Sequence, residues 1–257
     1  MTLTLADVER YTILRAEVGS RVLGVAIEGT DDRDEMGICI EPPEYVIGTK
    51  HFEQLVHRTQ AQGVRSGPGD LDLVIYSLRK WMRLALKGNP TVLMLLFAPP
   101  RSIDHSSYLP VGHKLRVHAH RFVSREAGGA FLGYMTSQRT QLTGERPRKH
   151  TNRPELIEQF GFDTKFAYHA VRLGIQGAEF LTTGKITLPI PEPDRSRLID
   201  LRLGKIELVD ALEWMSEVEQ SLVLARDGLD LTPPPYAWAD AFLIQAHQEF
   251  WAWKDML

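Results

Sequence analysis

The chain has 257 residues, of which 33 are Asp or Glu and 30 are Lys or Arg, so its formal net charge is −3. Hydrophobic residues make up 43% of it, and its single cysteine is Cys39. This length suits one large domain or two modest ones. The near-neutral charge excludes a strongly basic nucleic-acid binder, and the lone cysteine excludes disulfide scaffolds and zinc ribbons.

The same composition bears on location. The N-terminal segment lacks a basic stretch followed by an apolar run, and the longest apolar stretch, residues 92–98, is too short to span a bilayer. A lone cysteine is typical of a reducing compartment. The sequence therefore predicts a soluble, cytoplasmic protein.

The first part of the chain contains several short strand patterns. Residues 5–16 suit a short helix or an extended lead-in, which breaks at Gly19-Ser20. Residues 22–27 and 36–40 predict two strands on either side of an acidic turn, and residues 71–76 predict another strand.

After the strand predicted over residues 71–76, apolar residues recur at helical spacing. Residues 77–87 predict a helix that stops at Gly88-Asn89-Pro90, and residues 91–97 predict either a buried helix start or a strand. The alternation around His118 and His120 predicts a strand over 115–123, without enough further ligands for zinc. Apolar residues at three- and four-residue steps predict helices over 126–142, 162–180, 208–225 and 237–253.

Gly19 and Ser20, followed by Asp32 and Asp34, form the most informative segment. Residues two apart in a strand share a face, so the two carboxylates would lie side by side and repel unless a cation lies between them. Mg²⁺ prefers such hard oxygen ligands together with substrate phosphates. A glycine turn lets backbone N–H groups approach a phosphate, and a serine hydroxyl can donate to it. These residues predict a metal-dependent triphosphate site.

A third carboxylate would complete a two-metal site, in which one ion activates the attacking hydroxyl and the other neutralises the leaving pyrophosphate. Asp72, at the start of the 71–76 strand, is the first candidate, and Asp70 is the fallback on the same face. We expect Asp32 and Asp34 to contact both ions, and Asp72 to contact the ion that holds the attacking hydroxyl. A solvated hairpin loop is the alternative interpretation of the acidic turn.

The pattern Gly19-Ser20 followed by Asp32-x-Asp34 resembles the signature of the DNA polymerase β nucleotidyltransferase superfamily. Later segments resemble its RNA-ligase-associated branch, the RNA repair pathway nucleotidyltransferases, and the resemblance runs from about Gly19 to Leu212. These segments are DLVIYSLRKW (72–81), KGNPT (87–91), GYMTSQ (133–138), KFAYHAVR (165–172) and LTTGKITL (181–188).

The resemblance implies an α+β fold, in which a small mixed β-sheet with flanking helices carries the carboxylates. It also implies a helical C-terminal domain that closes over the nucleotide. We therefore expect a nucleotidyltransferase domain over residues 1–120 and a mainly helical domain over 121–257. One departure is the acidic Glu35, where relatives commonly carry an apolar or basic residue. Glu35 is either a solvated neighbour of the site or a residue that alters metal affinity.

Two groups of basic residues are candidate phosphate contacts. Lys165, His169 and Arg172 share one face of the 162–180 helix, and with the resemblance we expect them to bind the nucleotide; an ordinary exposed basic face is the alternative. The most basic segment of the chain is a candidate RNA contact or, equally, a solvated loop. Its candidate residues are Arg146, Arg148, Lys149 and Arg153.

Together these features predict a Mg²⁺-dependent nucleotidyltransferase, with Mn²⁺ as a substitute ion. It would transfer a nucleoside monophosphate from an NTP to a hydroxyl and release pyrophosphate, and the resemblance favours an RNA end as the acceptor. The sequence leaves open nucleotidylation of a protein or small molecule, and nucleotide binding without turnover. It sets neither the preferred NTP nor the oligomeric state.

Overall fold

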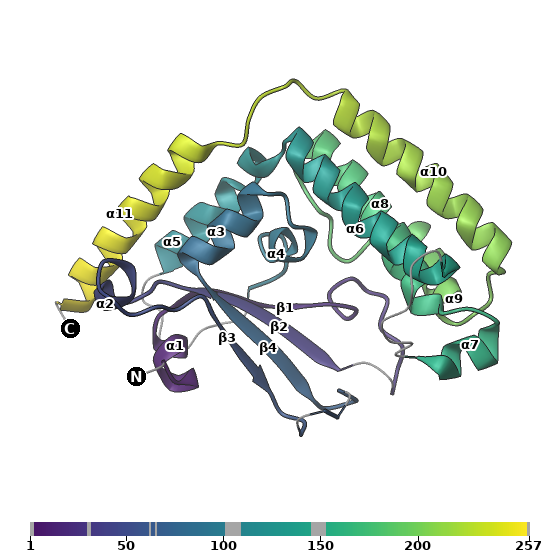
Figure 1. Ribbon diagram of the computed structural model, residues 1–257, viewed down its shortest axis with the longest axis horizontal. Helices are drawn as coiled ribbons and strands as arrows, with labels where there is room; N and C mark the ends of the chain where they lie inside the picture. Colours follow the sequence, from purple (N-terminus) through teal and green to yellow (C-terminus); the bar gives the residue numbers. More distant parts are fainter. Residues whose placement is uncertain are drawn as a thin grey trace. The chain divides into compact units, whose positions relative to one another are not determined.

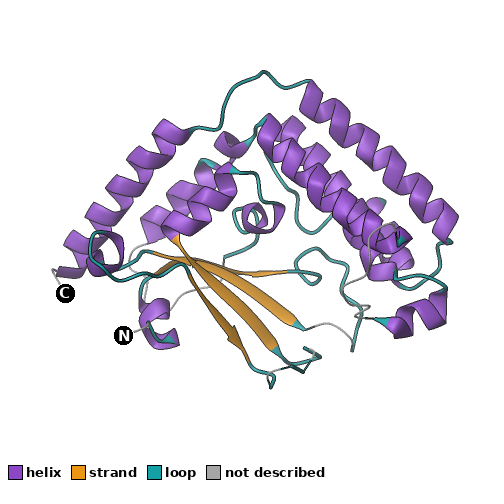
Figure 2. Ribbon diagram, viewed as in Figure 1, coloured by secondary structure: helices purple, strands orange, loops and turns teal. Residues whose placement is uncertain are grey.

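The computed structural model describes residues 3–29, 32–61, 63–64, 66–100, 109–144 and 153–255, and within them four strands form one sheet (Figures 1 and 2). The strands are β1 (Thr12–Val18), β2 (Arg33–Cys39), β3 (Gln54–Arg58) and β4 (Leu71–Ser77). Their spatial order is β1-β2-β4-β3; β2 and β4 are parallel, and both edge strands are antiparallel to their neighbours. The expected mixed sheet of an α+β fold is confirmed.

The other regular elements of the described residues are helices. Their bounds are α1 Leu5–Arg10, α2 Pro43–Val46, α3 Leu78–Leu86, α4 Pro90–Met94, α5 Leu109–Val117, the 3₁₀ helix η1 Ala119–Phe122, α6 Arg125–Thr143, α7 Pro154–Phe160, α8 Thr164–Thr183, α9 Asp194–Arg202, α10 Leu208–Asp227 and α11 Tyr236–Asp255. None of the helices within the described ranges combines the length and apolar character that crossing a membrane requires.

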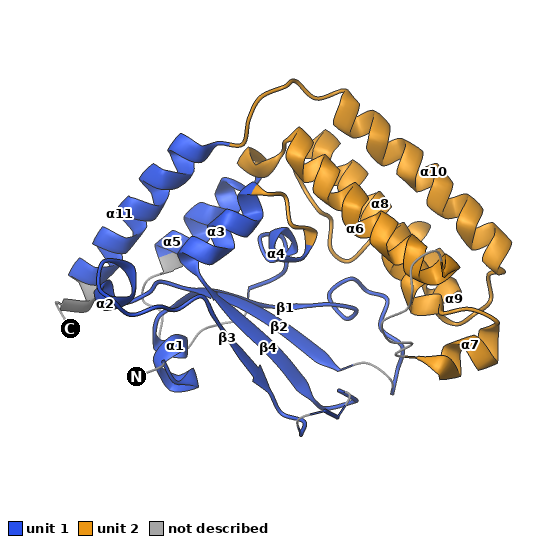
Figure 3. Ribbon diagram, viewed as in Figure 1, with its two compact units in different colours: residues 1–86, 91–119, 235–257 blue, residues 87–90, 120–234 orange. Residues whose placement is uncertain are grey.

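The chain divides into two compact units (Figure 3). Unit 1 comprises residues 1–86, 91–119 and 235–257, and unit 2 comprises residues 87–90 and 120–234. In this division residues 87–90 belong to unit 2, and α11 belongs to unit 1.

Both faces of the sheet in unit 1 are covered. On one face, Leu73 and Ile75 of β4 are fully buried in a cluster with Val8 of α1 and Tyr45 of α2. On the other face, α5 approaches so closely that a Cβ on Gly112 would lie 2.3 Å from the carbonyl oxygen of Ile13. The burial of these apolar side chains fixes the strand register, since a slip of one residue would turn every side chain to the opposite face.

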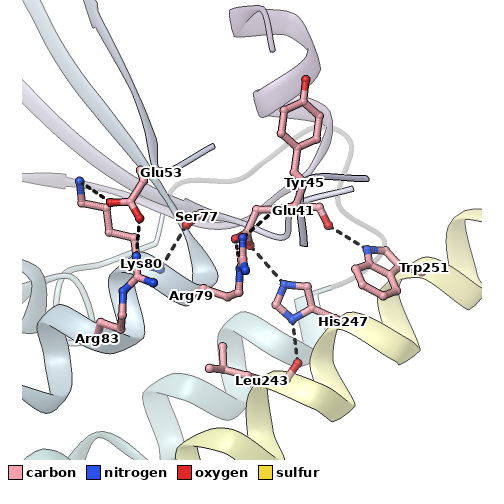
Figure 4. Close-up of polar contacts among 10 residues, drawn as sticks. All are labelled: Glu41, Tyr45, Glu53, Ser77, Arg79, Lys80, Arg83, Leu243, His247 and Trp251. Atoms are coloured by element: carbon pink, nitrogen blue, oxygen red, sulfur yellow. Dashed lines mark hydrogen bonds and ion pairs between the residues drawn. The ribbon is translucent and has the colours of Figure 1, made fainter. Parts of the chain in front are cut away.

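Within unit 1, a buried carboxylate links helix α11 to the rest of the unit (Figure 4). Glu41, whose side chain is fully buried, accepts a hydrogen bond from Arg79 Nε at 2.9 Å, and His247 Nε2 lies 3.2 Å from its other oxygen. Trp251 donates to the Glu41 carbonyl at 2.8 Å. Burial alone would raise the pKa of Glu41, but the hydrogen bonds from His247 and Arg79 outweigh it and hold that pKa below its usual value.

Unit 2 is built on three long helices, α6, α8 and α10, which pack against one another. Ser124 caps α6 by accepting a hydrogen bond from the Ala127 N–H at 3.1 Å, and Asp163 caps α8 by accepting from Lys165 N–H at 3.0 Å. The helices expected over 126–142, 162–180 and 208–225 are confirmed.

Some local predictions are wrong. Residues 22–27 form no strand: Gly19 to Val25 make a turn closed by backbone hydrogen bonds, and the partner of β2 is β1 instead. Residues 115–123 form no strand: α5 continues to Val117 and η1 covers Ala119–Phe122. Val111 and Leu115, four residues apart, are both buried on one face of α5. His120 lies in η1 and His118 stacks on Trp238, at 5.5 Å between ring centroids. The ambiguous segment 91–97 begins in α4.

We expect Glu41→Gln to lower the free energy of unfolding by about 3 kcal/mol, because it leaves Arg79 and His247 facing a site that has lost its charge. Glu53→Gln is the matched control: Glu53 pairs with Lys80 and Arg83 at the surface (Figure 4), where such pairs contribute less than about 1 kcal/mol. Urea unfolding at neutral pH measures both. Equal destabilisation by the two variants would contradict this account of α11.

Candidate functional site

Three carboxylates converge at one end of the sheet. One oxygen from each of Asp32, Asp34 and Asp72 lies within 4.8 Å of the others, and all three residues are half-buried. Asp34 and Asp72 are directly opposite each other on the parallel strands β2 and β4, and Asp32 immediately precedes β2. Three like charges at this separation repel unless a cation lies among them. An all-oxygen donor set of this kind fits a divalent cation such as Mg²⁺.

The Gly19-Ser20 turn lies against Asp34. Val18, the last residue of β1, pairs with Asp34, and Gly19 follows it with a φ of +86°. A Cβ added to Gly19 would lie 2.5 Å from Asp34 Oδ2, so glycine is required both for the backbone conformation and for the approach of the carboxylate. Ser20 is half-buried, and its carbonyl accepts a hydrogen bond from Val25 N–H at 3.0 Å.

Asp72 is held by the loop between β3 and β4. Gln60 Nε2 donates to Asp72 Oδ1 at 2.9 Å and Ser66 Oγ donates to Asp72 Oδ2 at 2.9 Å, while Arg58 Nε lies 3.6 Å from Oδ1. Both carboxylate oxygens are therefore oriented by neutral donors. The buried Gln60 Oε1 has no hydrogen-bond partner among the described residues, so an acceptor is available beside the carboxylates.

Asp70, the fallback for the third carboxylate, lies outside the group. Its carboxylate accepts hydrogen bonds from Thr59 Oγ1 at 3.1 Å and from Gly67 N–H at 3.0 Å. Its carbonyl accepts a hydrogen bond from the N–H of Arg33, the first residue of β2, at 2.9 Å. Asp70 therefore fixes the loop beneath the site.

Glu35 faces away from the carboxylates. Adjacent residues of a strand point to opposite faces, and the fully buried Glu35 side chain lies 2.6 Å from Arg15 Nε and 3.2 Å from Arg33 Nε. Glu35 is buried, so the interpretation of a solvated neighbour is wrong. Its charge is neutralised by two arginines on the far face of β2.

In unit 2, Lys165, His169 and Arg172 lie on α8 as expected. Burial and the positive charges of Arg172, Lys165, Arg153 and Arg202 lower the pKa of His169 well below its usual value. Arg153, predicted as an RNA contact, therefore belongs to the same basic group. Arg146, Arg148 and Lys149 lie outside the described residues.

Residues 4–225 match the family model described as RNA repair pathway DNA polymerase beta family. The chain belongs to this family. The resemblance seen in the sequence is thereby confirmed, and the protein is a nucleotidyltransferase of the DNA polymerase beta type. Members of such a family use a divalent metal, and the group formed by Asp32, Asp34 and Asp72 can hold one.

One solved structure is a nucleotidyltransferase-like protein from Exiguobacterium sibiricum, which is 13% identical to this member of the RNA repair pathway family. The alignment covers 91% of this chain and 69% of that one, with a TM-score of 0.29. No curated protein matches the chain.

Sequence reasoning missed the residues that orient the predicted ones. Two of these residues, Gln60 and Ser66, lie in the polar loop between β3 and β4, and Arg58 is the last residue of the edge strand β3. No periodic sequence pattern there indicates a contact with Asp72. Gln176 accepts a hydrogen bond from Arg172 Nη1 at 2.8 Å. It lies four residues after Arg172 on α8, so extending the helical spacing of the basic residues by one step could have found it.

We expect Gly19→Ala to lower nucleotidyl transfer about a hundredfold, because displacing a reacting group by about 1 Å costs that much. The added methyl would push Asp34 out of the group. Gly29→Ala is the control, since Gly29 also has a positive φ, of +76°, but has open space around its Cβ. Steady-state rates of both variants measure the effect, and equal losses would show that Asp34 is not the cause.

The lowered pKa of His169 predicts a pH dependence of stability. The unfolded state, with a histidine pKa near about 6.5, binds more protons than the folded state just below that pH. The free energy of unfolding should therefore fall as the pH drops from about 6.5 towards the folded-state pKa. His169→Asn should flatten this fall in urea titrations between neutral and mildly acidic pH. An unchanged slope in the variant would assign the dependence to other groups.

Proposed function

We propose that this protein is a Mg²⁺-dependent nucleotidyltransferase that transfers a nucleoside monophosphate from an NTP to a hydroxyl at an RNA end, with release of pyrophosphate. The observation that carries the proposal is the convergence of Asp32, Asp34 and Asp72 beside the Gly19-Ser20 turn, in a chain of the RNA repair pathway family. Mn²⁺ is expected to substitute, since it takes the same oxygen ligands.

The carboxylates fit the metal by their chemistry. Divalent ions bound there would neutralise charge on the phosphates and make the acceptor hydroxyl more acidic. In this proposal Asp32 and Asp34 would hold both ions, and Asp72 would hold the ion that makes the acceptor hydroxyl more acidic. Gln60 and Ser66 keep the Asp72 carboxylate in one orientation, because each donates to a different oxygen.

The remaining side chains serve the phosphates. Gly19 brings the turn against Asp34, and the Ser20 hydroxyl is a proposed donor to the triphosphate. Lys165, His169 and Arg172 are proposed phosphate contacts, since cationic donors favour phosphate over water.

The RNA acceptor is supported by the family description, and Arg146, Arg148, Lys149 and Arg153 are its proposed backbone contacts. We also propose a cytoplasmic location, which the single cysteine favours.

We expect Asp32→Asn, Asp34→Asn and Asp72→Asn each to lower label transfer from α-³²P-labelled NTPs at least about a hundredfold, because metal-held charge contributes several kcal/mol to such reactions. Asp70→Asn is the matched control and should retain most activity, since Asp70 lies outside the group.

Supplying RNA, protein and metabolites as separate acceptor pools identifies the acceptor in the same assay. Label in RNA alone is expected, whereas label in protein or metabolites would replace the RNA acceptor. Full activity in Asp34→Asn would contradict the proposed mechanism.

A further inference from the structure

Unit 2 carries a group of basic side chains from three helices, here called the basic cluster: Arg153, Lys165, His169, Arg172 and Arg202. Arg153 immediately precedes α7, and Arg202 is the last residue of α9. The other three lie on α8 at four- and three-residue steps. The fold thus brings together side chains that are distant in the sequence.

The outer members of the basic cluster are fixed by contacts with α8. Arg153 Nη1 donates to both carboxylate oxygens of Asp163, at 3.0 and 2.9 Å, and its guanidinium lies 5.1 Å from the centre of the Phe166 ring. The Arg202 guanidinium lies 5.3 Å from the centre of the Tyr168 ring. A guanidinium held over an aromatic ring is attracted by the π face of that ring, which restricts its orientation.

Two buried donors on α8 have no hydrogen-bond partner among the residues that the structure describes. Arg172 Nη1 donates to Gln176 Oε1 at 2.8 Å, which fixes the amide so that its nitrogen points away from Arg172 Nη1. Gln176 is 3% exposed, yet neither its Nε2 nor Arg172 Nε has a hydrogen-bond partner within the described part of the chain. A buried donor without an acceptor is costly, so two of them on neighbouring turns point to an acceptor that binds there.

The charge around these donors is positive. His169, one turn before Arg172, is half-buried, and its pKa is lowered by burial first and then by the four cations of the basic cluster. An anion among those cations would reverse this effect and favour the imidazolium form. An anionic acceptor would complement both the unpartnered donors and the surrounding cations.

We propose that Arg172 and Gln176, with the surrounding basic cluster, form one phosphate-binding site contained within unit 2. Guanidinium, ammonium and amide donors that converge from several directions match a tetrahedral, multiply charged phosphate. The proposal deepens the proposed function and rests on it for the source of the phosphate, which is the NTP or an RNA strand. At this site Arg153 would serve the same phosphate as Lys165, His169 and Arg172. Its proposed role as an RNA contact then holds only if that phosphate belongs to RNA.

The test is binding to the full chain in EDTA, where the carboxylate group holds no divalent ion. The probes are inorganic phosphate, ATP, and a short RNA with and without a 5′-phosphate, followed by calorimetry and by the imidazole proton resonance of His169. We expect phosphate to raise the pKa of His169. Arg172→Met and Gln176→Leu should each weaken phosphate binding about tenfold, the usual effect of losing a hydrogen bond to a charged group.

Arg139→Met is the matched control, because Arg139 is a cation of unit 2 that pairs with Glu219 and lies on α6. It should leave phosphate binding unchanged. Gln176→Glu, which places a carboxylate beside the phosphate, should weaken binding more than Gln176→Leu, and thermal unfolding verifies that each variant folds. If ATP competes with phosphate and binds more weakly to Arg172→Met and Gln176→Leu, the phosphate belongs to the NTP. If the RNA does so instead, the phosphate belongs to RNA.

Phosphate affinity that is equal in wild type, Arg172→Met and Gln176→Glu would overturn the proposal, as would a His169 resonance that does not respond to phosphate. Asp34→Asn separates this proposal from the proposed function. If Asp34→Asn retains full activity while phosphate binds at Arg172 and Gln176, the nucleotidyl transfer mechanism fails and this site stands. If Asp34→Asn is inactive but phosphate does not bind, only this site fails.

Discussion

The parallel pairing of β2 with β4 is the constraint on which the site depends, because it places Asp34 directly opposite Asp72. Two unit charges within 4.8 Å repel by about 3 kcal/mol at an effective dielectric constant of about 20. Buried apolar residues further along the same strands, such as Ile38 and Ile75, hold the register against this repulsion. The sheet thus keeps in place an arrangement that a divalent cation would stabilise.

The residues around Asp34 and Asp72 fix the positions of these two carboxylates. Gly19 leaves space for Asp34 where any side chain would collide with it, and Gln60 and Ser66 orient Asp72 without adding charge. Glu35 adds a negative charge in sequence but not at the site, since Arg15 pairs with it on the opposite face. The negative charge of the carboxylate group therefore comes from Asp32, Asp34 and Asp72.

Asp32 and Asp34 could be predicted because their signal is local: a glycine turn followed by two aspartates two residues apart. Short apolar runs indicated individual strands, whereas the mixed sheet was expected from the family resemblance. The edge strand β3 gave no such signal, since Gln54, His57 and Arg58 are polar and its apolar Val56 is exposed. The alternation of His118 and His120 wrongly predicts a strand over 115–123. The residues that indicate a helix there are Val111 and Leu115, and Val111 lies outside that segment. Gln60 and Ser66 act through tertiary contacts that no spacing encodes.

The central claim is that Asp32, Asp34 and Asp72 together bind a divalent cation. Anomalous diffraction from crystals of the full chain grown with Mn²⁺ and a non-hydrolysable NTP tests it most directly. The account predicts anomalous density among the three carboxylates, lost in Asp34→Asn and retained in Asp70→Asn. Mn²⁺ density elsewhere in the molecule, with none among these carboxylates, would contradict it.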